Sequence, residues 1–259
     1  MPASPLKLWT LDELKVVFYQ YFQMPFGRMH SGNPEIIELA GLIGRTPSSV
    51  AMKLVNFASL DPSITQTGRK GLSKASTLDK EVWSNFHSDW ESLAEECEAL
   101  KQKFAEENSL NVMERLPEYS LEEFVGETTR AVVEIRLKQR FFRNAVLSSY
   151  RERCCMSGVS DTRLLVASHI VPWKDDKSNR LNPRNGLCLS AIHDKAFDKG
   201  LLTITDDLKI VLSEELLRKN DSFIQRVFHP LHNRKIEEPE RFIPDRQFLE
   251  HHRQRVFLK

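Results

Sequence analysis

The stretch from Thr162 to Gly200 constrains the fold more than any other part of the chain, because its patterns follow the order strand, loop, strand, helix. TRLLVASHIVPW is apolar and rich in β-branched residues, which favours a strand that ends at Pro172. A polar loop separates it from NGLCLS, which predicts a second short strand, and SAIHDKAFDKG predicts a helix from about Ser190 to Gly200. LLTITDDLKIVLS then alternates and turns at Asp206–Asp207, as a hairpin does. We therefore expect an α+β fold with a ββα unit.

Three polar side chains accompany these elements: His169 in the first strand, Asn185 just before the second, and His193 in the helix. A histidine suits a general base because its pKa lies near neutrality. A divalent cation offsets charge on a phosphate and its leaving oxygen, and a ββα unit holds such groups in one cleft. A lone histidine in an apolar strand is commonly a packed core residue. The combination of all three predicts metal-assisted hydrolysis of a phosphodiester bond.

The same stretch resembles the HNH nuclease family with its ββα-metal fold, and within it the branch of predicted bacterial restriction endonucleases. The resemblance rests on the turn CCMSG (154–158), which has that branch's C-x-x-[ST]-G form, on the lead-in RLKQRFFRNAVLSSY, and on NGLCLSAIHDKAFDKGLLTI. It is close over residues 136–215. The C-terminal tail resembles that branch's closing element more loosely. The N-terminal half resembles the companion region sometimes joined to these nucleases, and this match is weaker and less specific.

This resemblance implies a role for each polar residue. His169 matches the general base, Asn185 matches the asparagine that pins the loop, and His193 matches a metal ligand. Many members carry an aspartate or histidine ligand where this chain has Ser168. Asp198 is therefore the candidate second ligand, with Asp194 a weaker one, unless Asp198 instead caps or braces the helix. The implied cofactor is a divalent metal ion, Mg²⁺ first, with Mn²⁺, Ni²⁺ or Zn²⁺ as alternatives.

The N-terminal half contains PEIIELAGLIGRTPSSVAMKLVNFASLD, which predicts a helix, a turn at Gly44–Thr46 and a second helix that begins at Pro47. Two short helices around such a turn are typical of a helix-turn-helix, whose second helix enters the major groove with its N-terminal residues. The candidate DNA contacts are Arg45, Ser48, Ser49 and Lys53. The alternative is a helical hairpin that only supports a neighbouring domain.

Two further basic segments predict contacts with phosphates. The loop GRKGLSKAS (68–76) presents Arg69 and Lys70, although many such loops are only solvated turns. The predicted helix that precedes the CCMSG turn places Arg136, Arg140 and Arg143 on one face. A basic face is commonly just solvated, but its position directly before the candidate nuclease site favours a phosphate-contacting surface.

Composition shifts suggest a helical, DNA-recognising domain over 1–109, a linker over 110–128 and the nuclease domain over 129–259. Residues 78–109 form a long helical pattern with one apolar stripe. That stripe either packs on the chain's own domain or pairs with a second copy as a short coiled coil. Because one nuclease site cuts one strand, a homodimer is one route to a double-strand break.

Composition excludes several other classes of protein. The hydrophobic fraction of 41% and the charged fraction of 28% are ordinary for a globular protein. No apolar run approaches the ~20 residues of a membrane span, and MPASPLKLWTLDEL lacks the apolar core of a signal peptide, so we expect a cytoplasmic protein with no membrane partner. The four cysteines form no secreted disulfide pattern and no C-x-x-C pair. With a net charge of +1, DNA affinity must come from local patches.

These patterns together predict a two-part, metal-dependent endonuclease that acts on double-stranded DNA, in a restriction-type defence setting implied by the resemblance. One alternative is a nuclease of broad specificity, such as a toxin or an effector, with the same chemistry but no site recognition. The other is a DNA-binding protein whose catalytic site has decayed, an option that Ser168 keeps open.

Overall fold

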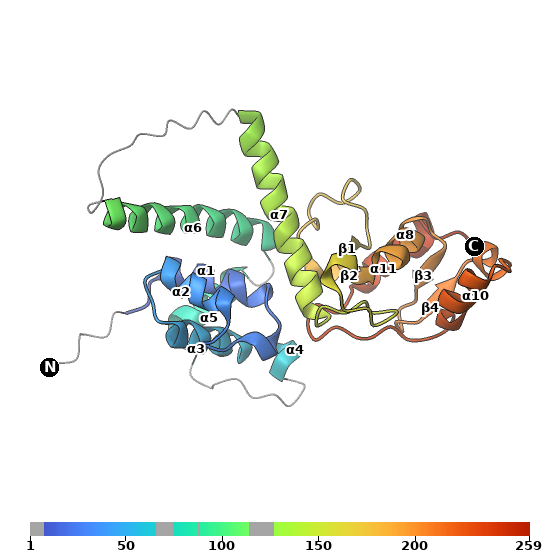
Figure 1. Cartoon of the computed structure of the whole chain (residues 1–259), viewed down its shortest axis with the longest axis horizontal. Helices are drawn as coiled ribbons and strands as arrows, with labels where there is room; N and C mark the ends of the chain where they lie inside the picture. The colour runs from blue at the N-terminus through green and yellow to red at the C-terminus, as the bar shows by residue number, and fades with distance from the viewer. Residues whose placement is uncertain (1–7, 66–74, 87–88, 114–126) are drawn as a thin grey trace. The chain divides into compact units, whose positions relative to one another are not determined.

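The computed structural model describes residues 8–65, 75–86, 89–113 and 127–259 (Figure 1). They divide into two compact units, Met1–Lys138 and Gln139–Lys259. The division lies within a helix, ten residues beyond residue 129, where the sequence predicted that the nuclease domain begins. Most of the predicted linker over 110–128 is outside the described residues. None of the helices in the described ranges is both long and apolar enough to span a lipid bilayer.

The first unit is helical and is built around its first helix. Its elements are α1 (Leu11–Phe22), the 3₁₀ turn Phe26–Arg28, α2 (Pro34–Leu42), α3 (Pro47–Ala58), α4 (Pro62–Thr65), α5 (Thr77–Phe86) and α6 (Trp90–Met113). Helix α1 packs against α3, α5 and α6. Phe18 is fully buried there and lies edge-on to Phe22, with ring centroids 4.6 Å apart. Such aromatic packing makes α1 the centre of the unit's apolar core.

The predicted pair of short helices is present at the predicted positions. Thr46 precedes α3, and its hydroxyl accepts a hydrogen bond from the backbone N–H of Ser49, while Pro47 occupies the first helical position. Gly44, in the turn, has φ +65°, a conformation that favours glycine. Local capping signals therefore predicted both helix ends.

The long helical pattern over 78–109 forms two helices, α5 and α6. The Asp89 carboxylate accepts a hydrogen bond from the backbone N–H of Ser92, and this N-terminal cap begins the second helix. Leu93 and Cys97 are fully buried, and α6 packs on α1. The apolar stripe is thus covered, at least in part, within its own unit.

The second unit contains the expected ββα order. Its elements are α7 (Glu127–Ser149, which crosses the division), the 3₁₀ turn Thr162–Leu164, β1 (Leu165–His169), the 3₁₀ turn Pro183–Asn185, β2 (Gly186–Ser190), α8 (Ala191–Asp198), β3 (Leu202–Ile204), β4 (Ile210–Leu212), α9 (Glu214–Leu217), α10 (Ser222–Val227), the 3₁₀ turn His229–Leu231 and α11 (Arg246–Arg255). Strands β1 and β2 are antiparallel, with His169 opposite Gly186, and α8 packs on both. Strands β3 and β4 form the predicted hairpin.

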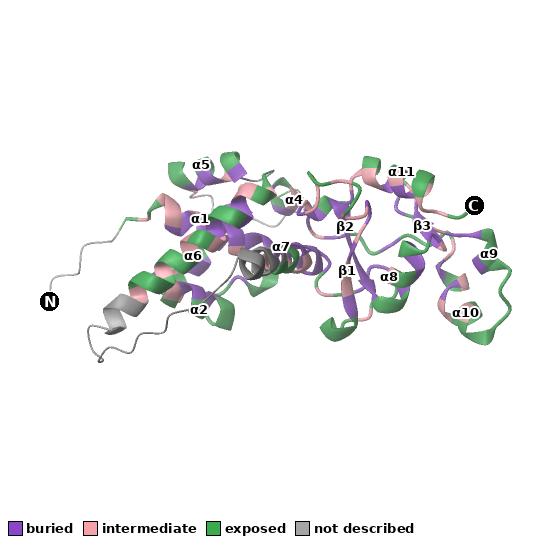
Figure 2. Ribbon diagram, turned by 90° about the horizontal axis from the view of Figure 1, so that it is seen from above, coloured by how far each residue is buried: buried purple, intermediate pink, exposed green. Residues whose placement is uncertain are grey.

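Helix α7 packs against β2 so closely that the strand needs a glycine. All five residues of β2 are buried (Figure 2). A Cβ on Gly186 would lie 2.3 Å from Cγ2 of Val146 and 3.0 Å from Cζ of Phe142. The absence of a side chain therefore lets the α7 residues reach the strand pair at the position opposite His169.

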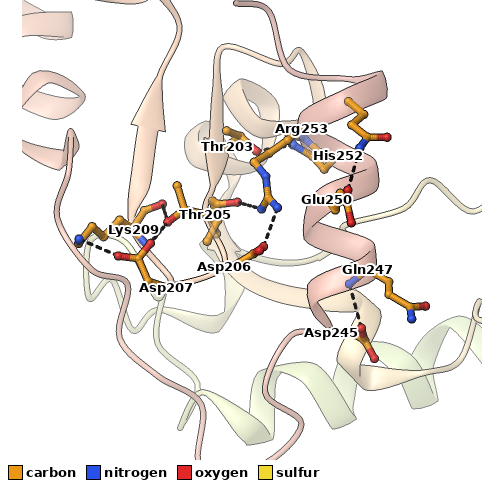
Figure 3. A network of polar contacts seen from close by, with 12 residues as sticks. Thr203, Thr205, Asp206, Asp207, Lys209, Asp245, Gln247, Glu250, His252 and Arg253 are labelled. Atoms are coloured by element: carbon orange, nitrogen blue, oxygen red, sulfur yellow. Dashed lines mark hydrogen bonds and ion pairs between the residues drawn. The ribbon is translucent and has the colours of Figure 1, made fainter.

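Helix α11 is held on β3 by buried polar contacts (Figure 3). Nδ1 of His252 lies 2.9 Å from Oγ1 of Thr203, and its Nε2 donates to the carbonyl of Phe197 at 3.1 Å. The imidazole also stacks on the Phe197 ring, with centroids 3.7 Å apart. Arg253 adds a bond to the carbonyl of Ile204. The C-terminal helix is thus tied to the hairpin that follows α8.

The burial of His252 predicts a loss of stability in acid. Burial lowers its pKa from 6.5 to about 4, so the unfolded chain binds the proton first as the pH falls. Above pH 6.5 the histidine is neutral in both states and costs no stability. As the pH falls from 6.5 to 4, the free energy of unfolding decreases, and the total loss is about 3 kcal/mol. Urea unfolding at pH 7.5 and 4.5 measures the effect as a difference from His252→Gln. An equal pH dependence in both proteins would contradict this prediction.

A side chain at Gly200, which follows α8, should clash with the backbone of the C-terminal segment. Gly200 has φ +68°, and a Cβ there would lie 2.0 Å from the backbone oxygen of Val256. Gly200→Ala should lower the free energy of unfolding by about 1–2 kcal/mol for the left-handed backbone and about 1–3 kcal/mol more for the clash. Gly158, with φ +75° and nothing within 4 Å of its Cβ, is the matched control. Equal losses for the two alanine variants, measured by denaturant unfolding, would exclude the clash.

Candidate active site

His169 lies at the end of β1 and is held by three neighbours. Its ring stacks on Phe142 of α7, with centroids 3.8 Å apart and planes 9° apart, and Trp173 meets it edge-on at 5.5 Å. Its Nε2 is 2.9 Å from the carbonyl oxygen of Arg180. Because a carbonyl only accepts, Nε2 carries the hydrogen and donates it, and a neutral ring then has its lone pair on Nδ1.

Burial lowers the pKa of His169 below 6.5, and the bond to the Arg180 carbonyl opposes this shift only in part. The ring is therefore neutral near pH 7. A neutral imidazole whose Nδ1 is unprotonated can accept a proton, which is the requirement for a general base.

This pKa shift predicts how cleavage depends on pH. If the neutral form of His169 is active, the rate falls only as the pH drops through a pKa that lies below 6.5. More than half of the plateau rate should therefore remain at pH 6.5. Single-turnover cleavage of a supercoiled plasmid from pH 5 to 8 measures this limb. An acidic midpoint at or above pH 6.5 would be the opposite result.

Asn185 is buried and binds the loop between the two strands near its start and in its middle. Its Oδ1 accepts from the backbone N–H of Val171 at 2.8 Å, and its Nδ2 donates to the carbonyls of Val171 at 3.2 Å and Asn179 at 3.3 Å. Asn179 directly precedes Arg180, whose carbonyl accepts from His169. Asn185 therefore ties down the loop whose Arg180 carbonyl accepts the hydrogen bond from His169; its part in positioning a general base stays a prediction.

Two contributors to this arrangement were not predicted from the sequence. Phe142 supplies the stacking face for His169. The guanidinium of Arg180 lies 5.0 Å from the Trp173 ring and donates to the Trp173 carbonyl at 2.8 Å. The only sequence signal for either was its position beside the motif, in the lead-in RLKQRFFRNAVLSSY or in the polar loop.

His193, in the first turn of α8, is buried with contrasting surroundings at its two nitrogens. Nδ1 lies 2.7 Å from Oγ of Ser190 and 3.6 Å from Sγ of Cys154, the first residue of the CCMSG turn. Nε2 is buried without a hydrogen-bond partner among the described residues. Phe228 meets the ring edge-on at 5.6 Å. The helix and the CCMSG turn thus meet at His193.

The four cysteines are free, buried thiols. Burial alone would raise the pKa of Cys154, but hydrogen bonds with His193 and Ser157 outweigh it and lower the pKa to about 6. Burial raises the pKa of Cys188 to about 12 and that of Cys155 well above its usual value. The thiol beside His193 therefore differs electrostatically from its neighbours.

The site offers a divalent cation one protein ligand, Nε2 of His193. Over the described ranges, no three His, Cys, Asp or Glu side chains gather in a group that could hold a metal ion. The orphaned Nε2 of His193 can accept a metal bond, and cations that bind phosphates commonly keep water in the rest of their shell. Asp198 is exposed at the end of α8; five residues of helix turn it about 140° away from His193. Its ligand role stays a prediction.

The cations predicted on the helical hairpin have partners inside the first unit. Arg45 forms an ion pair with Glu13 at 2.6 Å and has a side chain only 9% exposed. Lys53 forms one with the fully buried Asp79 at 2.8 Å. Ser48 is exposed, and Ser49 donates to the carbonyl of Thr46. These contacts give the two cations a structural role, and their contact with DNA stays a prediction.

The other predicted cations differ in their exposure. Arg69 and Lys70 lie outside the described residues. Arg136 and Arg140 are exposed on α7. Arg143 instead donates to the carbonyls of Leu165 at 2.8 Å and Thr162 at 3.0 Å. It therefore fastens α7 to the start of β1, while its two companions face solvent.

The loop between β1 and β2 adds cations that were not predicted as contacts. Lys174, Lys177 and Arg184 are exposed there, and no ion pair involves them among the described residues. All three follow His169 in the sequence. Unpaired, solvated cations are the groups that neutralise phosphates in complexes with DNA.

Comparisons with known proteins found a similar family and a similar solved structure. Residues 154–205 match the family model described as HNH endonuclease. One similar solved structure is a modification-dependent TagI restriction endonuclease, with 22% identity over 44% of this chain and 37% of that chain and a TM-score of 0.28. No curated protein matches the sequence. Residues 154–205, from the CCMSG turn to just beyond β3, are therefore similar in sequence to the HNH endonucleases, the family that the motifs of this stretch resemble.

Proposed function

We propose that this protein is a metal-dependent DNA endonuclease and that His169 is its general base. The observation that carries the proposal is the hydrogen bond from Nε2 of His169 to the Arg180 carbonyl at 2.9 Å. It directs the ring and leaves a basic Nδ1, and burial keeps the imidazole neutral. The match of residues 154–205 to the HNH endonucleases supports the same chemistry.

In the proposed reaction, Nδ1 of His169 takes a proton from a water molecule as that water attacks the phosphorus atom. A P–O bond forms to the water oxygen as the bond to the 3′ oxygen breaks. The leaving 3′ oxygen takes a proton from solvent, and His169 later returns its proton to solvent, which gives 5′-phosphate and 3′-hydroxyl ends. A divalent cation on His193 would offset the charge on the phosphate and the leaving oxygen. Asn185 and the Arg180 carbonyl keep the base in one orientation during this step.

The exposed cations of the second unit suggest where the DNA backbone lies. Arg140 on α7 and Lys174, Lys177 and Arg184 on the loop are solvated, so each can contact a phosphate without breaking an internal ion pair. In the first unit, the N-terminal end of α3 presents Ser48 to solvent. We assign site recognition to this helix and, from the resemblance, a restriction-type defence role to the protein.

Cleavage of a supercoiled plasmid tests the proposal. The full chain is incubated with Mg²⁺, Mn²⁺, Ni²⁺ or Zn²⁺, or with a chelator, on methylated and unmethylated plasmid, and the ends are mapped. Discrete products that need a metal ion support a restriction-type nuclease, and smearing supports a nuclease of broad specificity. Binding without cleavage under every metal condition would instead indicate a decayed site.

A further inference from the structure

Ser190 occupies a helix-capping position but does not cap its helix. Its backbone is extended, with φ −70° and ψ 154°, and α8 begins at the next residue, yet its hydroxyl makes no capping hydrogen bond. The hydroxyl lies instead 2.7 Å from Nδ1 of His193, three residues along the chain. The third residue of a helix is the one whose backbone N–H a capping serine usually binds. The hydroxyl thus interacts with the same residue but with its side chain.

Ser213 in the same unit shows the ordinary use of the same position. It precedes α9, and its hydroxyl accepts from the backbone N–H of Leu216 at 3.2 Å. Both serines are buried and both have extended backbones. Of the two, Ser213 makes the capping hydrogen bond and Ser190 does not. A departure from local capping preference is most informative where a side chain with a chemical role gains from it.

The surroundings of His193 indicate which nitrogen carries the hydrogen. A hydrogen on Nδ1 has two acceptors in reach, Oγ of Ser190 at 2.7 Å and Sγ of Cys154 at 3.6 Å. A hydrogen on Nε2 would be buried without an acceptor, because Nε2 has no hydrogen-bond partner in the described parts of the chain. Buried N–H groups are rarely left unpaired. The contacts therefore favour the Nδ1–H tautomer, with a lone pair on Nε2.

We propose that Ser190 is a positioning residue that holds His193 as the Nδ1–H tautomer, so that the buried Nε2 keeps a lone pair that can bind a divalent cation. The tautomer assignment stands on the contacts alone, and the cation rests on the proposed function. Ser190 acts through His193 and does not itself bind the cation. Groups that fix the orientation and tautomer of a ligating histidine commonly change metal affinity by about 10- to 100-fold.

Nitrogen NMR of ¹⁵N-histidine-labelled full-length protein tests the tautomer directly. The His193→Gln variant identifies the His193 signals. We expect the Nδ1–H pattern in the wild type, its loss or mixing with Nε2–H in Ser190→Ala, and no change in Ser213→Ala. Ser190→Thr, which keeps a hydroxyl, should restore the wild-type pattern. An Nε2–H signal in the wild type, or an unchanged signal in folded Ser190→Ala, would overturn the proposal.

Calorimetric titration with Ni²⁺ in the absence of DNA tests whether Nε2 of His193 binds a divalent cation. The difference between the wild type and His193→Gln isolates the site from the other histidines. Ser190→Ala should weaken this binding about tenfold or more, while Ser213→Ala leaves it unchanged. Equal affinity in the wild type and Ser190→Ala would overturn the positioning role. Plasmid cleavage is scored separately, so an inactive wild type with the Nδ1–H tautomer and an intact Ni²⁺ site would refute the nuclease and not this inference.

Discussion

Replacing His169 with alanine should lower the rate of DNA cleavage by about 100- to 10,000-fold, the usual contribution of a general base. The imidazole is the group whose Nε2 is bound to the Arg180 carbonyl and whose Nδ1 is left to accept a proton. Alanine removes that acceptor and leaves Phe142 and Trp173 without the ring they pack against. Single-turnover cleavage of a supercoiled plasmid measures the loss.

DNA affinity separates loss of chemistry from loss of binding. Gel-shift titration without divalent ions should give similar affinities for the wild type and His169→Ala, because the exposed cations of the loop remain. His30→Ala is the matched control, since that histidine is exposed in the first unit and should leave the rate unchanged. A His169→Ala protein that is folded, binds DNA and cuts at the wild-type rate would refute the assigned base.

Replacing Asn185 with alanine should reduce both stability and activity. The change leaves the backbone N–H and C=O of Val171 without the partners they now have in a buried site. Each unsatisfied buried group costs about 1–3 kcal/mol, so the free energy of unfolding should fall by about 2–6 kcal/mol for the two groups. The loop also loses its tie to Asn179, and misplacement of a catalytic group by about 1 Å costs about 100-fold in rate.

Asn182 in the same loop provides the control for Asn185. Its side chain accepts from the backbone N–H of Arg184 at 3.0 Å and donates to Oδ1 of Asn179 at 3.0 Å, but it is only partly buried. Asn182→Ala should cost about 1–2 kcal/mol, because it removes two ordinary, partly exposed side-chain hydrogen bonds, with little change in rate. Denaturant unfolding and single-turnover cleavage measure both variants. Equal effects at the two positions would show that burial and loop anchoring do not distinguish Asn185.

Much of the second unit followed from local sequence signals. The predicted strands match β1 and β2, and the predicted helix from Ser190 to Gly200 matches α8 (Ala191–Asp198). In the first unit, Thr46 and Pro47 marked the start of α3. These signals depend on residues a few positions apart, so they can be recognised without knowing the fold.

The ion-pair partners of the cations in the first unit could not be predicted from local signals. Arg45, in the turn just before the second helix of the hairpin, and Lys53, on that helix, were among the predicted DNA contacts, because residues there usually enter the major groove. In the structure, Arg45 binds Glu13 and Lys53 binds Asp79, which lie 32 and 26 residues away in the chain. No local pattern indicates which distant carboxylate reaches a given cation.

The sequence alone therefore determined the order of elements around the site, the three polar residues within it and the likeness to the HNH endonucleases. Only the tertiary structure decided what each of those side chains contacts: the Arg180 carbonyl for His169, Val171 and Asn179 for Asn185, and Ser190 with Cys154 for His193. The physical reason is range. Periodicity and capping act between neighbours in the chain, whereas the tautomer and basicity of an imidazole depend on groups that only folding brings within hydrogen-bond distance.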